Sequence, residues 1–357
     1  MDDDTLRAAR LRAHRLSAPA ADPVAAARHM LAVQSQEFWG GRWALGVRSR
    51  GRPTLGDLDR AFERARLVRS WTQRGTLHIC AAEDLGWMLS LTAGRQLRAA
   101  AGRHRQLGLD DDAFARAERA VRGALRGGGR LTRAEAADRI AAAGVATDGQ
   151  RGIHLLLALS VRGVICQGPV VPRESGISRE QFFVLSEEWL PEAAAPADPA
   201  AELFVRFIDG HGPATAGDFA WWSGLTLTAC RAAAEAASDR VRVVADAPDP
   251  QYVARRTPRS SPVAPAVVAL PAFDEYYLSY LDRQRVCALP HQLIVGPGAN
   301  GMISPLILAG GVVAGRWRHS RALGRREAAR ADMFGTPWVP ATDVDAALDR
   351  YAAFIAG

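Results

Sequence analysis

Gln34, Ser35 and Gln36 form the short segment of this chain whose side chains could act most directly on a substrate. Each glutamine amide has a carbonyl oxygen that accepts a hydrogen bond from water or faces a developing cation. A neutral amide cannot act as a strong general base, as a carboxylate would. In an extended segment the two side chains lie on the same side, whereas on a helix they diverge by about 200°. The alternative is that both are exposed polar residues at a helix end.

The residues that follow this segment are also candidates for a site. Glu37 could be an additional base, although an isolated acidic residue is more often a solvated charge. Trp39, Arg42 and Trp43 could border a pocket, but aromatic residues near a helix start more often belong to the core. The sequence therefore leaves both interpretations open for these four residues.

The charge of the chain favours a nucleic-acid partner. All 45 basic residues are arginine, there is no lysine, and the net charge is +7. High-GC coding bias is the simplest cause of the missing lysines, yet no lysine ε-amine is then present for a Schiff base or a Walker-type phosphate contact. Guanidinium groups suit bidentate contacts with phosphates, although an arginine-rich surface can also be merely solvated.

Four arginines near the glutamine segment are the candidates for contacts with DNA phosphates. Arg74 is the best placed, because it stands beside Gly75 in a predicted turn. His78 is expected to pack inside the strand that follows this turn. The four candidates are Arg42, Arg48, Arg69 and Arg74.

The composition excludes several other classes of protein. A chain of 357 residues with 48% apolar content can bury a sizeable core in two or more subdomains. No apolar run approaches the ~20 residues of a membrane span, and the N-terminus lacks the apolar region of a secretory signal. We therefore expect a cytoplasmic protein without membrane contact. The sequence does not determine the oligomeric state, and we take a monomer as the starting expectation.

The cysteines indicate neither disulfides nor a metal site. They are widely spaced and form no zinc-binding pattern, so we expect four buried thiols and no metal or cofactor. They are Cys80, Cys166, Cys230 and Cys287.

Residues 1–110 are predicted to be mainly helical. Apolar and charged positions alternate with helical spacing, until β-branched and aromatic residues around Arg74-Gly75 indicate a turn into a strand. The predicted elements are helices over Leu6–Arg15, Val24–Val33 and Asp57–Arg66, a turn and strand within Ser70–Ala81, and a helix over Asp84–Leu91.

Residues 111–190 follow the order of a winged helix: helices, a turn and a two-stranded wing. Thr132 and Glu135 have the spacing of a capping box. The predicted elements are helices over Asp111–Leu125, Thr132–Ala143 and Gln150–Arg162 and strands over Gly163–Pro172 and Gln181–Leu185.

A second helix-turn-helix pattern follows the linker Pro191–Pro199. Thr215 is predicted to cap a helix in it, and one ring of Trp221-Trp222 is expected in the core. The recurrence favours an array of winged helices. The predicted elements are helices over Ala201–Gly210, Thr215–Ser223 and Thr226–Ala237 and a strand over Val241–Val244.

The remainder is predicted to be a β-rich subdomain over 250–340 with a closing helix. Val and Ile alternate with Gly-rich turns there. The predicted elements are strands over Val263–Leu270, Gly301–Leu308 and Gly311–Trp317 and a helix over Ala341–Ile355 within residues 341–357.

Five segments in this order resemble the AlkZ/YcaQ-like winged-helix DNA glycosylases, over about 290 of the 357 residues. The segments are LAVQSQEFWGGRWALGVRSR (31–50), SWTQRGTLHICAAEDLGWM (70–88), GPATAGDFAWWSGL (212–225), PAFDEYYLSYLDR (271–283) and ISPLILAGGVVAGRWR (303–318).

The resemblance implies an α+β, predominantly helical fold. It consists of three tandem winged-helix modules (1–110, 111–190 and 200–246) and a β-rich subdomain, in a C shape with a basic concave face.

The family motif is Gln, a middle residue, then Gln or Asp, which places the catalytic residues at Gln34 and Gln36. The middle residue is commonly apolar, whereas here it is Ser35. Asp274, Arg283 and Trp317 also lie in segments that resemble the family. The simpler interpretation of these three residues is a structural role, such as a buried ion pair.

The implied activity is excision of alkylated bases from double-stranded DNA, notably bulky or crosslinked adducts. A purine alkylated at N7 or N3 is already cationic and leaves without a general acid. Two amides can then position water and stabilise the oxocarbenium-like sugar. With no lysine for a Schiff base, the product should be an abasic site in an intact strand.

Two other functions remain as alternatives. A winged-helix transcription regulator would explain the helix-turn-helix patterns and the charge, but not the segment 31–50. A metal-dependent nuclease would need clustered acidic residues and histidines. The acidic runs at 2–4 and 110–112 look instead like charges at helix starts.

Overall fold

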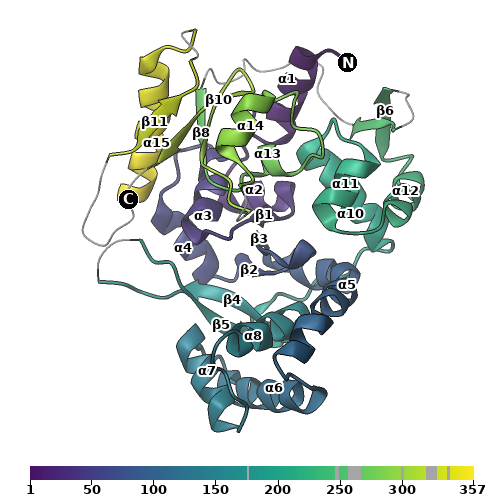
Figure 1. Cartoon of the computed structure of the whole chain (residues 1–357), viewed down its shortest axis with the longest axis vertical. Helices are drawn as coiled ribbons and strands as arrows, with labels where there is room; N and C mark the ends of the chain where they lie inside the picture. The colour runs from purple at the N-terminus through teal and green to yellow at the C-terminus, as the bar shows by residue number, and fades with distance from the viewer. Residues whose placement is uncertain (175–176, 246–248, 256–266, 299–300, 319–327, 336–337) are drawn as a thin grey trace.

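A computed structural model provides the three-dimensional structure (Figure 1). It describes residues 1–174, 177–245, 249–255, 267–298, 301–318, 328–335 and 338–357. Helices predominate, and the strands form sheets of five, four and two strands, with antiparallel pairing throughout. The predicted α+β, mainly helical class is confirmed.

The N-terminal part is mainly helical, as predicted, but two helices end elsewhere than predicted and one helix is additional. The predicted helix over Val24–Val33 ends at Met30, because Leu31 adopts a positive φ of 65° and an extended segment follows. A helix over Phe38–Val47 was not predicted from its glycine-rich sequence, and the helix predicted to end at Leu91 continues to Gln106. The elements are α1 Asp3–Ala13, α2 Pro23–Met30, β1 Val33–Gln34, α3 Phe38–Val47, α4 Leu55–Glu63, β2 Leu67–Trp71, the 3₁₀ turn η1 Gln73–Gly75, β3 Leu77–Ala81, η2 Ala82–Asp84 and α5 Leu85–Gln106.

Residues 111–190 form the predicted order of helices and strands. Thr132 and Glu135 make both hydrogen bonds of a capping box, so the predicted helix start is confirmed. The elements are α6 Asp111–Leu125, α7 Arg133–Ala142, α8 Arg151–Val161, β4 Ile165–Val170, β5 Gln181–Leu185 and α9 Ser186–Trp189.

The next segment also has the predicted helices, and Thr215 caps the second of them in a box with Asp218. A further strand pairs with the predicted one to complete a two-stranded sheet. The elements are α10 Pro199–His211, α11 Ala216–Ser223, α12 Leu227–Ala236, β6 Val241–Ala245 and β7 Gln251–Ala254. The assignment of these segments to three winged-helix modules in a C shape stays a prediction.

The C-terminal part contains the predicted strands, one unpredicted strand and the closing helix. The start of the predicted strand at 263–266 lies outside the described residues. The elements are β8 Val267–Leu270, α13 Glu275–Leu278, α14 Leu289–Val295, β9 Leu306–Ala309, β10 Val312–Arg318, β11 Arg330–Met333 and α15 Ala341–Ala356.

Two of the predicted units share one sheet. Its strand order is β1-β3-β2-β4-β5, so strands from residues 33–81 continue into strands from residues 165–185. The junction is a single antiparallel bridge between Arg69 of β2 and Gln167 of β4. In Figure 1 this sheet lies between the N-terminal helices above and α6–α8 below.

The largest core joins the N-terminal helices to the C-terminal sheet. Trp43 of α3 donates its indole N–H to the carbonyl of Ala269 in β8, and Trp317 of β10 donates to Leu270. Trp39 packs edge-on against Trp317 and Tyr351. Trp39 and Trp43 are buried core residues, which is the structural one of the two interpretations left open for them.

A buried ion pair fixes the segment that follows β8. Nη1 and Nη2 of Arg48 donate to the Asp274 carboxylate at 2.8 and 2.7 Å, and both side chains are 0% exposed. Asp274 also caps α13 by accepting from Tyr276 N. The suggested role of Asp274 in a buried ion pair is therefore confirmed.

Breaking this pair should destabilise the fold strongly. Asp274→Asn leaves the buried Arg48 charge without its counter-ion, and we expect a loss of about 3–5 kcal/mol in the free energy of unfolding. The matched control is Asp112→Asn, which breaks the exposed pair with Arg116 and should cost at most about 1 kcal/mol. Urea denaturation measures both; equal losses in the two variants would contradict the assignment.

Candidate functional site

The glutamine segment lies at the end of β1 and in the bend that leads to α3. Gln34 is the last residue of β1 and pairs with His78 of β3, and Ser35 N donates to Leu77 O at 2.8 Å. Gln34 is buried, whereas Gln36 is exposed. The segment is not helical, so helical geometry does not force the two glutamine side chains apart.

Both amide oxygens face the connection between β2 and β3. The Gln34 oxygen accepts from Arg74 Nη2 at 3.0 Å, and the Gln36 oxygen accepts from Leu77 N at 3.1 Å. A carbonyl oxygen has two lone pairs, so each can still accept a hydrogen bond from water. The segment therefore presents two neutral acceptors on one side of the chain.

Ser35 occupies a tight site between the two glutamines. Arg69 donates to its hydroxyl at 3.0 Å and to its carbonyl at 2.7 Å, and a Cβ at Gly41 would lie only 2.4 Å from the Ser35 Cβ. Gly41 therefore allows α3 to approach the segment, and Arg69 also donates to Gln167 of β4 at 2.7 Å. A serine at the commonly apolar position is accommodated by a buried guanidinium.

A buried carboxylate lies directly behind the segment. Glu275, the first residue of α13, is 0% exposed, and its Oε1 accepts from Gln34 N at 2.8 Å. Its Oε2 accepts from Trp222 Nε1 at 3.0 Å and from Ser279 Oγ at 2.7 Å. The imidazole of His211 approaches Oε2 to 3.8 Å. Glu275 thus connects β1, α10, α11 and α13.

This carboxylate carries its charge at neutral pH. Burial on its own would raise the pKa of Glu275, but His211, His78 and Arg74 lower it to about 2. Burial lowers the pKa of His78 to about 4, although Glu275 opposes that shift. The segment therefore has a fixed negative charge behind it and a neutral imidazole beside it.

Arg74 is held in a strained turn next to Gln34. Its φ is +56° within η1, a conformation that is uncommon for residues other than glycine. Burial lowers the pKa of its guanidinium, and the charge of Glu275 opposes this effect. Arg74 is partly exposed and is the one predicted arginine that contacts a glutamine of the motif.

Comparison with known proteins identifies the family of this chain. The sequence model of a family described as "DNA glycosylase AlkZ-like" matches residues 27–354. The chain belongs to the AlkZ-like DNA glycosylase family. The chain is 24% identical over 280 residues to an "Interstrand DNA cross-link repair glycosylase" of Streptomyces sahachiroi, with 74% of each chain covered. The structure of the "Streptomyces sahachiroi DNA glycosylase AlkZ" is similar in fold, with a TM-score of 0.80 at 21% identity over 99% of this chain and 96% of that chain.

Three of the four predicted DNA-binding arginines are buried and form hydrogen bonds within this AlkZ-like fold. Arg42, 0% exposed, donates to Asp59 and to Ser178 O, and Arg48 pairs with Asp274. Arg69 is 6% exposed and bound to Ser35 and Gln167. Their guanidinium groups cannot reach a phosphate in this structure, so phosphate binding does not hold for these three. Arg74 alone keeps that proposed role.

The remaining candidates divide into structural and surface residues. His78 is buried and packed in β3, as predicted. Trp222 is a core residue and Trp221 is 43% exposed, so the expectation of one core ring is confirmed. Glu37 accepts from Trp39 Nε1 at 3.0 Å, which gives it a structural contact in place of a free carboxylate.

Sequence reasoning missed Glu275, the residue that contacts the motif most closely from behind. It stands beside Asp274 in the family segment 271–283, and the two adjacent carboxylates were the available signal. Only the structure shows that one of them pairs with Arg48 and the other with Gln34 N.

Other expectations can be compared with the described residues. The four cysteines are free and buried, as predicted. No group of three or more His, Cys, Asp or Glu side chains in the described ranges could hold a metal ion. None of the described helices is long and apolar enough to cross a membrane.

Neutral His78 should make stability depend on pH. Its pKa is about 4 in the folded protein and about 6.5 when unfolded, so the unfolded state binds an extra proton between these values. The free energy of unfolding should fall as pH decreases from 6.5 to 4. We expect His78→Asn, which keeps a polar atom near Nδ1, to flatten this decline in urea titrations. An unchanged slope would contradict the assignment.

Proposed function

We propose that this AlkZ-like protein is a monofunctional DNA glycosylase that hydrolyses the N-glycosidic bond of cationic alkylpurines. Its substrates would be N7-alkylguanine and N3-alkyladenine in double-stranded DNA, including bulky adducts. Gln34 and Gln36 are the proposed catalytic residues. Membership of the family supports the glycosylase activity, and the geometry of the motif supports the choice of substrate.

The observation that carries the proposal is the pair of neutral acceptors on one side of the segment. The oxygens of Gln34 and Gln36 both face the Arg74–Leu77 connection. They can hold water for attack on C1′ and face the positive charge that develops on the sugar. They cannot remove a proton as a carboxylate would, so the leaving base must already be activated. A cationic alkylpurine meets this requirement.

Glu275 is a proposed positioning residue for the same step. It holds Gln34 through its backbone N–H and contributes a fixed negative charge behind it. At an effective dielectric constant of about 20, two unit charges attract by about 4 kcal/mol at about 4 Å and less at greater distance, so a carboxylate behind the motif would stabilise a developing positive charge by on the order of 2 kcal/mol. That energy corresponds to roughly thirtyfold in rate.

The absence of lysine supports hydrolysis without strand cleavage. A bifunctional glycosylase needs an amine that forms a Schiff base with the sugar, and no side chain of this sequence provides one. The proposed product is therefore an abasic site in an intact strand. The Streptomyces sahachiroi relative is named an interstrand DNA cross-link repair glycosylase. We therefore include interstrand crosslinks among the proposed substrates.

The test is excision from duplex DNA that carries N7-alkylguanine. Cleavage that appears only after hot alkali supports the glycosylase. Metal-dependent cleavage without alkali would indicate a nuclease, and binding without cleavage would indicate a regulator. Gln34→Ala and Gln36→Ala should each lower the rate about 100-fold or more, with DNA affinity largely retained. Gln284→Ala, at an exposed glutamine elsewhere, is the control, and full activity in both motif variants would refute the site.

Glu275→Gln should slow excision without abolishing it. The substitution keeps the size of the side chain and removes its charge, so we expect a decrease of roughly thirtyfold in the single-turnover rate. Glu235→Gln is the control, because it removes a carboxylate charge from an exposed position of α12 that forms no ion pair with the described residues. That variant should excise at close to the normal rate. Equal losses in the two variants would contradict a specific role for the Glu275 charge.

A further inference from the structure

Helix α5 carries an arginine face that no acidic residue compensates. Between Leu85 and Leu109 the sequence contains no Asp or Glu, but it contains Arg95, Arg98, Arg103 and Arg105. All four are exposed. None of them takes part in an ion pair with any residue that the structure describes.

The neighbouring helix α6 shows the opposite pattern. Its Arg116 pairs with Asp112 and its Arg122 pairs with Glu118, each one turn away. The arginines of α5 have no such acidic neighbours along their helix. An uncompensated row of guanidinium groups creates a positive potential that attracts an anionic polymer.

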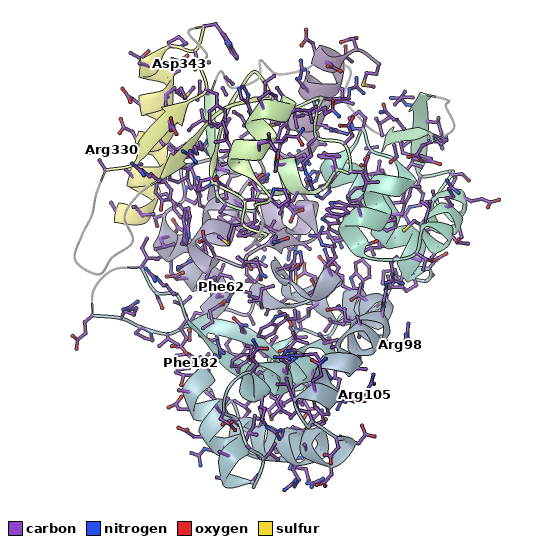
Figure 2. The ribbon with its side chains drawn as sticks, viewed as in Figure 1. Phe62, Arg98, Arg105, Phe182, Arg330 and Asp343 are labelled. Atoms are coloured by element: carbon purple, nitrogen blue, oxygen red, sulfur yellow. The ribbon has the colours of Figure 1, made fainter. Side chains whose placement is uncertain are left out.

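Three of the four arginines share one side of α5. At 3.6 residues per turn, Arg98 and Arg105 differ by about 20° around the helix axis, and Arg95 lies within about 80° of both. The three span about 15 Å along the axis. Figure 2 shows Arg98 and Arg105 projecting outward from α5 on the same side of the molecule. Arg103 differs, because it donates to Gln106 and Gln150.

A cavity connects this face to the glutamine motif. It has a volume of about 240 Å³ and lies between the 74–75 turn, α5 and the connection from α11 to α12. Arg74 and Arg95 both line it, and Arg74 also donates to Gln34. The arginine face therefore begins at the motif and continues along α5 away from it.

The cavity has further features that suit a sugar-phosphate backbone. Gln96 lines it, and its amide nitrogen and oxygen are buried without a hydrogen-bond partner among the described residues. Gly75 and Gly224, both at positive φ, border it without side chains, so a bound chain can approach closely. Ala99, Ala100 and Leu157 provide apolar contact for a sugar ring.

We propose that this cavity and the α5 face, defined by Arg95, Arg98 and Arg105, hold consecutive phosphates of the DNA strand beside the candidate site. Arg74 and Arg95 bind the phosphate nearest the damaged nucleotide, with Gln96 donating from the cavity wall. Arg98 and Arg105 bind phosphates further along the strand. The inference rests on the proposed function in that the bound polymer is DNA.

The experiment measures the affinity for undamaged duplex DNA by fluorescence anisotropy over a range of salt concentrations. Each phosphate contact contributes about −0.9 to the slope of log affinity against log salt. Arg95→Gln, Arg98→Gln and Arg105→Gln should each make the slope shallower by about 0.9, and Arg95→Gln/Arg98→Gln by about 1.8. Arg95→Lys and Arg98→Lys keep the charge and should retain most of the slope.

The control is Arg119→Gln, at an exposed arginine of α6, which should leave the slope unchanged. Unchanged slopes in the α5 variants, or an equal change in the control, would overturn the inference. The measurement does not depend on catalysis. If the wild type excises the base but the α5 variants have the same salt dependence of affinity as the wild type, only this inference is refuted. If the α5 variants show a shallower salt dependence but the wild type excises nothing, only the proposed glycosylase activity is refuted.

Discussion

The buried carboxylate of Glu275 is the interaction on which the arrangement of the candidate site depends. It accepts hydrogen bonds from Gln34 N, Trp222 Nε1 and Ser279 Oγ, which come from widely separated parts of the chain. A buried charge is tolerated only when its hydrogen bonds are made, so these segments must meet in one geometry. The Glu275 carboxylate thus fixes the backbone of Gln34 relative to α11 and α13.

The adjacent carboxylate keeps Glu275 in place. Asp274 pairs with Arg48 at the end of α3 and also caps α13. Two consecutive acidic residues thus bind two different parts of the N-terminal region, one beside the motif and one behind α3. The core tryptophans Trp43 and Trp317 join the same regions through indole hydrogen bonds to β8. The C-terminal part is therefore needed to build a site whose motif lies near residue 34.

The charges are distributed in a way that suits the proposed chemistry. The motif offers neutral oxygens, and the carboxylate behind it, on Glu275, is fully buried. The arginines that sequence reasoning assigned to DNA are divided between two roles. Arg42, Arg48 and Arg69 are buried and hold the fold, whereas Arg74 is partly exposed and keeps the proposed role in phosphate binding. Guanidinium serves both roles because it makes several directed hydrogen bonds at once.

The sequence by itself determined the features that depend on local pattern. These are the helices with capping boxes at Thr132 and Thr215, the strands of the C-terminal part and the buried cysteines. It also located the motif through the family segments. It did not predict α3, since glycines are poor helix formers and the close packing of Gly41 on Ser35 and of Gly46 on Phe354 is seen only in the structure.

Tertiary structure alone decided which charges are buried and which are exposed. Nothing in the local sequence distinguishes Arg69, bound to Ser35, from Arg95, which faces solvent. Likewise, adjacent Asp274 and Glu275 acquire different partners only when α3, β1 and α11 pack around them. The burial and the partners of these charged side chains depend on contacts between segments far apart in the chain. The local sequence pattern does not indicate those contacts.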